Sequence, residues 1–250
     1  MRSVRFDPPL TTGVLIRRYK RFLADIRLDD GREITAHVAN TGAMTGCAEP
    51  GWRVALSHHP DKGRKLPFSW ELVRPEPPWG SGESWALVNT ARTNTIVGEA
   101  LRERRVPALA GYRSVRPEVR WDPESKSRFD FLLEDHDGGD LPCFVEVKNV
   151  TLRRAGVALF PDTVTARGTR HVHDLATIVQ SGRALAAMFY LVARQDCGSF
   201  APAADLDPEY AAAVAEAKDA GVACIVFDAR LSLEGFELGV CLRQAPRRCG

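Results

Sequence analysis

The sequence predicts a two-domain α/β protein in which a small β-barrel or sandwich precedes a mixed α/β domain. Three observations predict this division. Strand-like segments broken by turns fill the first third of the chain, a segment dense in Pro, Gly and Ser follows at 74–84, and helices then alternate with strands. A chain of 250 residues is long enough for two cores. We therefore expect domains at 1–84 and 85–250.

The composition is that of a globular protein, with 44% hydrophobic and 26% charged residues and a formal net charge of +2. These values exclude a mainly disordered chain, and the net charge alone does not indicate a polyanionic partner. No apolar run approaches the roughly 18 residues that cross a bilayer, and the first residues lack the apolar stretch of a signal peptide. We expect a cytoplasmic protein with no membrane partner.

The first domain contains four expected strand segments, at 13–28, 33–40, 52–59 and 66–74. Turn residues separate them, including a DDG sequence after the first segment. The linker cannot continue a strand because prolines interrupt it.

The second domain is expected to begin with a short strand at 85–89 and a helix at 93–105, where Thr93 or Asn94 can cap an apolar stripe. A strand at 115–121 follows. The turn EDHDGGD then joins two strands into a hairpin. The remaining elements are expected in the order helix, strand, helix, strand, strand, at 170–180, 184–193, 208–220, 222–227 and 235–242.

The predicted hairpin, 128–133 paired with 143–147, carries the residues whose side chains are candidates for catalysis. Alternation along a strand places Glu146 and Lys148 on one face, opposite Val145 and Val147. On the partner strand the same rule buries Phe129 and Phe131 together and turns Asp130 to the other face. If the strands pair as the turn indicates, Asp130 lies near Glu146 and Lys148.

Two carboxylates at one point repel unless a cation lies between them. Their oxygen atoms suit Mg²⁺ or Mn²⁺, and Lys148 is placed to orient water or stabilise charge on a phosphate. Glu99, on the preceding helix, is a candidate for a further carboxylate. A Glu-x-Lys pair alone is more typical of an exposed ion pair of little energetic weight. The combination of all four residues in this order favours a catalytic site of the kind that hydrolyses phosphodiesters.

Six scattered cysteines, without a CxxC pair, predict buried thiols rather than disulfides or a zinc site. The sequences His58-His59 and His171-x-His173 lack Cys or acidic partners at ligand spacing, so zinc is not expected there either. His171 is instead a candidate contact to phosphate.

The order of elements, with Glu99, Asp130, Glu146 and Lys148, resembles the core of the PD-(D/E)xK nuclease superfamily. More narrowly, six blocks spread over both halves resemble the sugar fermentation stimulation protein A family: RRYKRFLADI (17–26), NTGAMTGC (40–47), RKLPFSWEL (64–72), SRFDFLL (127–133), FVEVKNVTL (144–152) and FPDTVTARG (160–168). The resemblance implies an N-terminal OB-type barrel, a nuclease-like second domain, non-specific DNA binding and a regulatory role in maltose metabolism.

Carried over by position, the resemblance implies metal binding by Asp130 and Glu146, a catalytic Lys148 and an assisting Glu99. The family usually has an acidic residue where this chain has Ala166, so any role of that position is in doubt. In the same block, Asp162 and Arg167 are near enough in sequence to serve one phosphate or metal, although turn formation is the favoured interpretation for Asp162.

Basic and aromatic residues also interleave in the first domain. Basic groups neutralise phosphates and aromatic faces stack on bases, as in OB-type barrels that hold single strands. A half-buried strand shows the same alternation, and the two interpretations stay open. With Arg167, the candidate nucleic-acid contacts are Arg17, Arg18, Lys20, Arg21, Arg64 and Lys65.

The leading hypothesis is therefore a DNA-binding protein, with RNA as a further possible partner, that binds largely independently of sequence and has a Mg²⁺- or Mn²⁺-dependent nuclease site. The alternative is a non-cleaving DNA-binding factor that regulates sugar metabolism. A carbohydrate-binding function finds no support in any residue pattern.

Overall fold

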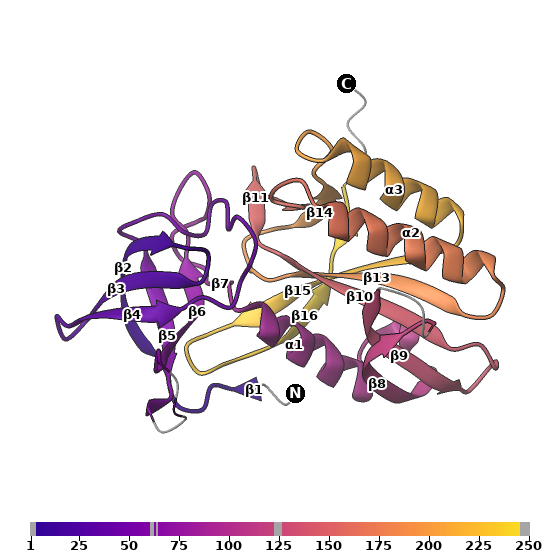
Figure 1. The fold of residues 1–250 in the computed structure, drawn as a ribbon, viewed down its shortest axis with the longest axis horizontal. Coiled ribbons are helices and arrows are strands. Elements are labelled where there is room, and N and C mark those ends of the chain that lie inside the picture. Colours follow the sequence, from indigo (N-terminus) through magenta and orange to yellow (C-terminus); the bar gives the residue numbers. More distant parts are fainter. Residues whose placement is uncertain (1–3, 61–62, 64, 123–126, 246–250) are drawn as a thin grey trace.

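The computed structural model describes residues 4–60, 63, 65–122 and 127–245, and consists of a small barrel beside a larger α/β domain (Figure 1). Five strands form the barrel in the order β4-β3-β2-β5-β6, and β4 closes it by pairing His37 with Ser69 of β6. This confirms the expected OB-type barrel. Its strands are β2 (Thr11–Tyr19), β3 (Leu23–Leu28), β4 (Glu33–His37), β5 (Arg53–His58) and β6 (Phe68–Arg74).

The barrel is held together by a core of its inward-facing apolar residues. Leu15, Ile26 and Leu56 are almost fully inaccessible to solvent, as is Trp70. The Trp70 indole N–H is satisfied by the carbonyl of Leu72, at 2.8 Å, so the ring is buried without an unpaired donor.

The second domain is built on a seven-stranded mixed sheet in the order β1-β16-β15-β13-β10-β9-β8. The three central strands are parallel and the others antiparallel. This is the expected mixed α/β architecture. The strands are β1 (Val4–Arg5), β8 (Tyr112–Arg120), β9 (Arg128–His136), β10 (Cys143–Val150), β13 (Leu185–Val192), β15 (Ala223–Leu231) and β16 (Gly235–Cys241).

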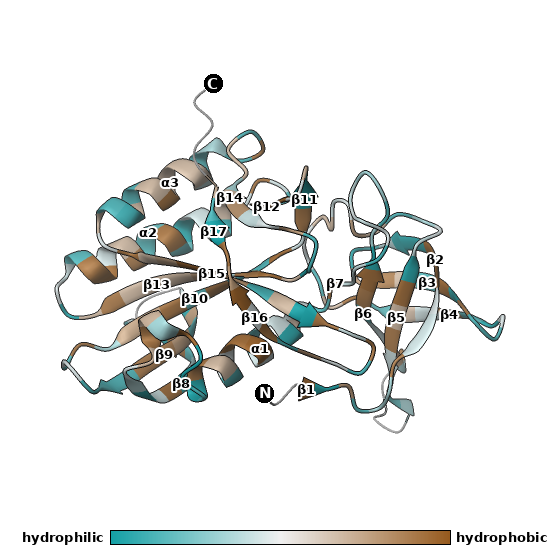
Figure 2. Ribbon diagram, turned by 180° about the vertical axis from the view of Figure 1, so that it is seen from behind, coloured by the Kyte–Doolittle hydropathy of each residue, from teal (hydrophilic) through white to brown (hydrophobic). Residues whose placement is uncertain are grey.

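Helices cover both faces of this sheet: α1 (Thr90–Arg102) packs on one, and α2 (Ala166–Gln180) and α3 (Pro208–Asp219) pack on the other. Strand β13 is apolar and buried along almost its whole length, as is typical of a parallel strand with helices on both sides. Figure 2 shows the same central strands as hydrophobic and the outer faces of the helices as mixed. No helix in the described part of the chain has the length and apolar character to span a membrane.

The remaining elements lie beside the main sheet. The 3-10 helix η2 (Pro107–Leu109) follows α1. A small second sheet contains β11 (Leu152–Arg154), β12 (Val157–Phe160), β14 (Ser199–Pro202) and β17 (Arg243–Gln244). Of the cysteines in the described ranges, all are free thiols, with Cys47, Cys143 and Cys197 buried, Cys224 half-buried and Cys241 exposed.

Helix α1 begins earlier than the sequence predicts, because its N-cap is Asn89 rather than Thr93 or Asn94. The Asn89 side chain accepts a hydrogen bond from the Ala91 N–H. Thr93 and Asn94 therefore lie inside the helix, free to contact the sheet. Likewise α2 begins at Ala166, capped by Thr165, rather than at residue 170.

The alternation predicted for β9 is wrong at one point. Phe131 packs in the core beneath α1, whereas Phe129 packs in the core beneath α2, so the two rings do not share a face. The pairing of β9 with β10 ends at the Phe131–Val145 pair, and β9 continues beside β8 alone.

The division at residue 84 stays a prediction, and two short strands pair across it. Strand β1 pairs with β16 of the second domain, while β7 (Ala86–Leu87) pairs with β6 of the barrel. The buried Glu71 carboxylate of β6 also accepts hydrogen bonds from Arg92 of α1 and from Asn89. These contacts fix the barrel against the second domain.

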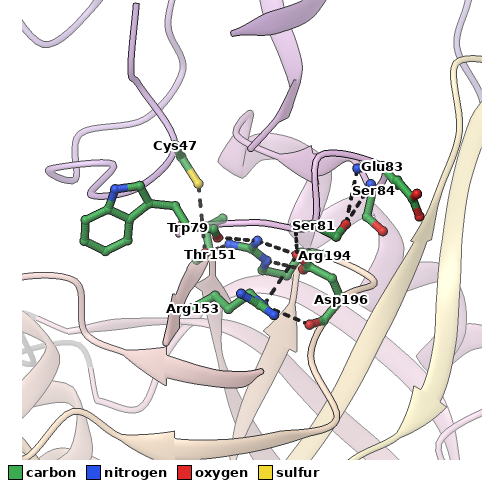
Figure 3. A network of polar contacts seen from close by, with 9 residues as sticks. All are labelled: Cys47, Trp79, Ser81, Glu83, Ser84, Thr151, Arg153, Arg194 and Asp196. Atoms are coloured by element: carbon green, nitrogen blue, oxygen red, sulfur yellow. Dashed lines mark hydrogen bonds and ion pairs between the residues drawn. The ribbon is translucent and has the colours of Figure 1, made fainter. Parts of the chain in front are cut away.

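The expected linker is anchored by the guanidinium of Arg194, which is 1% exposed (Figure 3). Arg194 donates to the carbonyls of Trp79, at 2.8 Å, and Thr151, at 2.7 Å, and forms an ion pair with Asp196. Asp196 in turn accepts from the Ser81 N–H. The segment therefore serves as a fixed connection between the domains.

Candidate functional site

A cleft of about 310 Å³ lies between the barrel and the second domain. The barrel contributes the segment after β4, and the second domain contributes the start of α1, strands β9 and β10, and the segment before α2. Its ionisable lining residues are Asp130, Glu146, Lys148, Asp162 and Arg167.

Asp130 lies where β9 and β10 separate, and its carboxylate replaces the missing strand partner. Its Oδ2 accepts the backbone N–H of Val147, at 2.7 Å, and its Oδ1 accepts the Asn94 side-chain amide, also at 2.7 Å. The predicted approach of Asp130 to Glu146 and Lys148 is therefore present, and α1 fixes the carboxylate through Asn94.

Glu146 is the most buried of these acids, at 4% exposure. Its Oε1 accepts from Lys148 Nζ at 2.5 Å and lies 2.6 Å from His171 Nδ1. A carboxylate can only accept, so Nδ1 carries the proton of this hydrogen bond. The other oxygen, Oε2, is buried and has no hydrogen-bond partner among the described residues.

Burial and the neighbouring charge of Glu146 raise the pKa of Asp130 to about 6. Burial also opposes ionisation of Glu146, but the hydrogen bond from His171 and the charge of Lys148 hold its pKa below the usual range. The cleft thus brings together three carboxyl groups, those of Asp130, Glu146 and Asp162, with two cationic side chains, Lys148 and Arg167. The site has excess negative charge of the kind that a bound cation neutralises.

The donor set fits a hard divalent cation that keeps several waters. Glu146 Oε2 is an unpaired buried anionic oxygen, and Asp130 stands beside it. The described residues contain no group of three or more His, Cys, Asp or Glu side chains arranged for a metal ion. Two protein carboxylates suit Mg²⁺, which is bound through one or two carboxylates together with water and substrate phosphates.

Glu99 does not line the cleft. The α1 residues that do are Thr90, Thr93 and Asn94, and a helix advances about 100° per residue, which places Glu99 on the far side from them. Because the helix starts at Thr90, the side chains that it presents to the cleft include Thr93 and Asn94, the two residues that the sequence predicted as caps.

Thr93 and His171 have roles at the site that differ from those the sequence predicted, and Asn149 was not predicted at all. Thr93 donates to Asn149 at 3.0 Å, which fixes β10 against α1 beside Lys148. His171 was expected to touch phosphate, but it is 2% exposed and directed at Glu146. Its position in the first turns of α2, on the apolar face with Val172 and Leu175, was the available signal.

Asp162 connects the two walls of the cleft. Its Oδ2 accepts the backbone N–H of Met44, at 2.8 Å, and its carbonyl accepts the Thr45 hydroxyl. Asp162 therefore shapes a loop, as the interpretation favoured from the sequence expects. The loop is the barrel segment with Met44 and Thr45 rather than the turn around Asp162 itself.

The basic residues predicted to bind nucleic acid separate into three groups. Arg167 lines the cleft. Arg17 is exposed but paired with Asp25, and Arg18 is half-buried and occupied by four backbone carbonyls. Lys20, Arg21 and Lys65 are exposed, whereas Arg64 lies outside the described residues.

The sequence and structure match known proteins along nearly the whole chain. Residues 16–88 match the family described as SfsA N-terminal OB domain, and residues 91–235 match the sugar fermentation stimulation protein RE domain. A sugar fermentation stimulation protein homolog of Paramagnetospirillum magneticum is 49% identical over 239 residues, covering 96% of this chain and 97% of the relative. A homolog of a Methylobacterium species is also 49% identical, covering 92% of this chain and 93% of the relative.

Among solved structures, that of Pyrococcus furiosus SfsA in complex with Ca²⁺ is similar, with a TM-score of 0.85 and 25% sequence identity. The match covers 98% of this chain and 100% of that one. With two family domains in the expected order and relatives that align along nearly their full length, this chain belongs to the sugar fermentation stimulation protein family.

Proposed function

We propose that this protein binds nucleic acid mainly through its phosphate backbone and hydrolyses phosphodiester bonds at the Asp130–Glu146–Lys148 site with a divalent cation. The observation that carries the proposal is the buried, unpartnered Oε2 of Glu146, a residue that lines the cleft together with a second carboxylate, Asp130, and two cationic side chains, Lys148 and Arg167. An unpaired buried anionic oxygen is costly unless a cation completes it.

Asp130 and Glu146 are the residues that would hold Mg²⁺ or Mn²⁺. When bound, such an ion lowers the pKa of its water and polarises a phosphoryl oxygen. The Ca²⁺ complex of the Pyrococcus furiosus relative supports divalent-cation binding, because Ca²⁺ and Mg²⁺ both prefer carboxylate oxygens.

The other side chains of the cleft have separate roles. Lys148, with its side chain 13% exposed, stabilises negative charge on the phosphate and orients the attacking water. His171 holds Oε1 of Glu146 so that Oε2 stays directed away from it. Arg167, near the N-terminus of α2, binds a non-bridging phosphate oxygen, since a helix N-terminus favours anions.

Binding that depends on phosphates rather than bases is largely independent of sequence. Lys20, Arg21 and Lys65 are exposed on the barrel and available for such contacts. Log affinity for duplex DNA should then fall linearly with log salt, by about 0.9 per phosphate neutralised. A salt-independent affinity would contradict this mode of binding.

A second candidate is a DNA-binding factor that regulates sugar metabolism without cleaving. The observation that favours it is the position of Glu99, because this helix acid, which the nuclease pattern expects at the site, does not line the described cleft. Lys148 is also engaged by Glu146 in this structure.

One experiment separates the two candidates. The purified protein is incubated with labelled single- and double-stranded DNA and RNA in Mg²⁺, Mn²⁺ or EDTA, beside Lys148→Ala and the exposed-helix control Lys218→Ala. Cleavage that requires metal and is lost only in Lys148→Ala supports the nuclease. Binding without cleavage in any metal supports the regulatory factor.

A further inference from the structure

We propose that the cleft takes an unpaired strand of nucleic acid, which enters across the β2–β3 turn with one base stacked on Phe22. The inference rests on the proposed function and names the substrate class of the same site. It concerns the turn made by Lys20, Arg21 and Phe22.

Phe22 is 46% exposed and is the only aromatic residue among the large hydrophobic side chains that the described residues leave exposed. Lys20 and Arg21 beside it are also exposed, and both have left-handed backbone angles, with φ of 48° and 62°. An exposed ring next to two cations combines a surface for stacking a base with charges for the neighbouring phosphates.

The turn is joined directly to the barrel wall of the cleft. A single nitrogen of Arg18, Nη2, donates to the carbonyls of Arg21 (3.0 Å), Asn40 (3.0 Å) and Gly42 (2.9 Å). Asn40 and Gly42 line the cleft. A strand that lies on Phe22 therefore needs to pass only this segment to reach the carboxylates.

The volume of the cleft and the burial of Glu146 favour one strand over two. Its volume of about 310 Å³ is at the lower end of the range of about 300–1,000 Å³ found for pockets that hold single small ligands. Glu146, which lines the cleft, is 4% exposed. A phosphate reaches it only by entering the cleft, and a paired strand would carry its complement against the barrel wall.

That wall is fixed at both ends, which prevents it from opening to admit a duplex. Arg18 holds the carbonyls of Asn40, Gly42 and Ala43, and the Met44 N–H is bound to Asp162 across the cleft. The segment 40–44 is therefore a structural limit on what enters.

The test measures binding in Ca²⁺ by fluorescence anisotropy, with a labelled oligothymidine and a blunt hairpin duplex of equal length. Stacking of one base on an aromatic ring predicts that Phe22→Ala weakens single-strand binding about 5- to 150-fold. Phe22→Trp should retain it, and the exposed apolar control Val240→Ala should leave it unchanged. Duplex binding should be weaker than single-strand binding and indifferent to Phe22→Ala.

Two results overturn the inference: a blunt duplex bound as tightly as the single strand, or equal affinities of Phe22→Ala and wild type for the single strand. Cleavage assays on the same variants separate this failure from that of the proposed function. Metal-dependent cutting of blunt duplex at an undiminished rate in Phe22→Ala contradicts the inference alone. Phe22-dependent binding with no cutting in any metal contradicts the nuclease proposal alone and supports the strand-binding surface.

Discussion

The two walls of the cleft are built differently. The second-domain wall presents ionisable side chains, Asp130, Glu146 and Lys148, from adjacent strands. The barrel wall at Asn40 and Gly42 is part of a loop held by Arg18. The comparison shows that regular strands position the candidate catalytic side chains, whereas a loop held by long-range hydrogen bonds limits the shape of the cleft.

The largest expected effect comes from separating the two walls. Arg194→Ala removes a buried cation and its hydrogen bonds to the Trp79 and Thr151 carbonyls, and leaves the half-buried Asp196 with Arg153, at 3.5 Å, as its ionic partner. Removing one partner of a buried ion pair costs about 3–5 kcal/mol. Urea denaturation should show this loss, with Lys218→Ala as the surface control. A loss below about 1 kcal/mol would mean that the network does not hold the domains together.

The next largest effect is on catalysis by the second-domain wall. Lys148→Ala should lower the rate of cleavage about 10²- to 10³-fold, because it removes a charge that stabilises the transition state. Binding to DNA, measured at the same salt, should change only by a small factor. Unchanged cleavage would remove Lys148 from the catalytic site.

A smaller effect is expected at His171, which touches Glu146 but does not line the cleft. His171→Phe removes the hydrogen bond to Oε1, and loss of such a supporting contact lowers metal affinity about 10- to 100-fold. Titration with Mn²⁺ tests this separately from activity. If His171→Phe binds the ion as wild type does, His171 acts only in packing.

On the barrel wall, Arg18→Lys should loosen the 40–44 segment, since an ammonium lacks the planar fork that reaches four carbonyls. We expect a loss of preference for single strands over duplex, with little change in metal binding. A matched change at Arg27, an exposed residue of β3 paired with Glu33, provides the control. Equal preferences in both variants would show that the loop does not limit entry.

The smallest effect is a pH dependence of stability. The pKa of Asp130 is raised to about 6 in the folded protein from 3.8. Between those values the folded state binds more protons than the unfolded state, so the free energy of unfolding falls as pH rises through this window. Asp130→Asn should flatten that part of the profile in denaturation at pH 4.5 and 7. An unchanged profile would mean that Asp130 is ionised as readily as an exposed carboxylate.

The sequence predicted the second-domain wall because the alternation of side chains along a β-strand depends only on neighbouring residues. Glu146 and Lys148 lie on one face, and the turn that closes the hairpin brings Asp130 to them. The burial of β13 follows from its composition in the same way. These features need no knowledge of residues distant in the chain.

The features that were missed depend on distant contacts or on one capping residue. Asn89 starts α1 early, which brings Asn94 to Asp130 and turns Glu99 away. The bond from Met44 to Asp162 joins residues far apart in sequence, and no periodic pattern predicts it. The sequence predicted Arg18 as a phosphate contact, because neither its residue type nor its spacing reveals that its guanidinium donates to backbone carbonyls.

The central claim is that Asp130 and Glu146 form a divalent-cation site. Isothermal titration with Mn²⁺ of wild type, Glu146→Gln and Glu99→Gln tests it most directly. The account predicts one site in wild type and Glu99→Gln, and no measurable binding in Glu146→Gln. Binding that survives in Glu146→Gln but is lost in Glu99→Gln would contradict it.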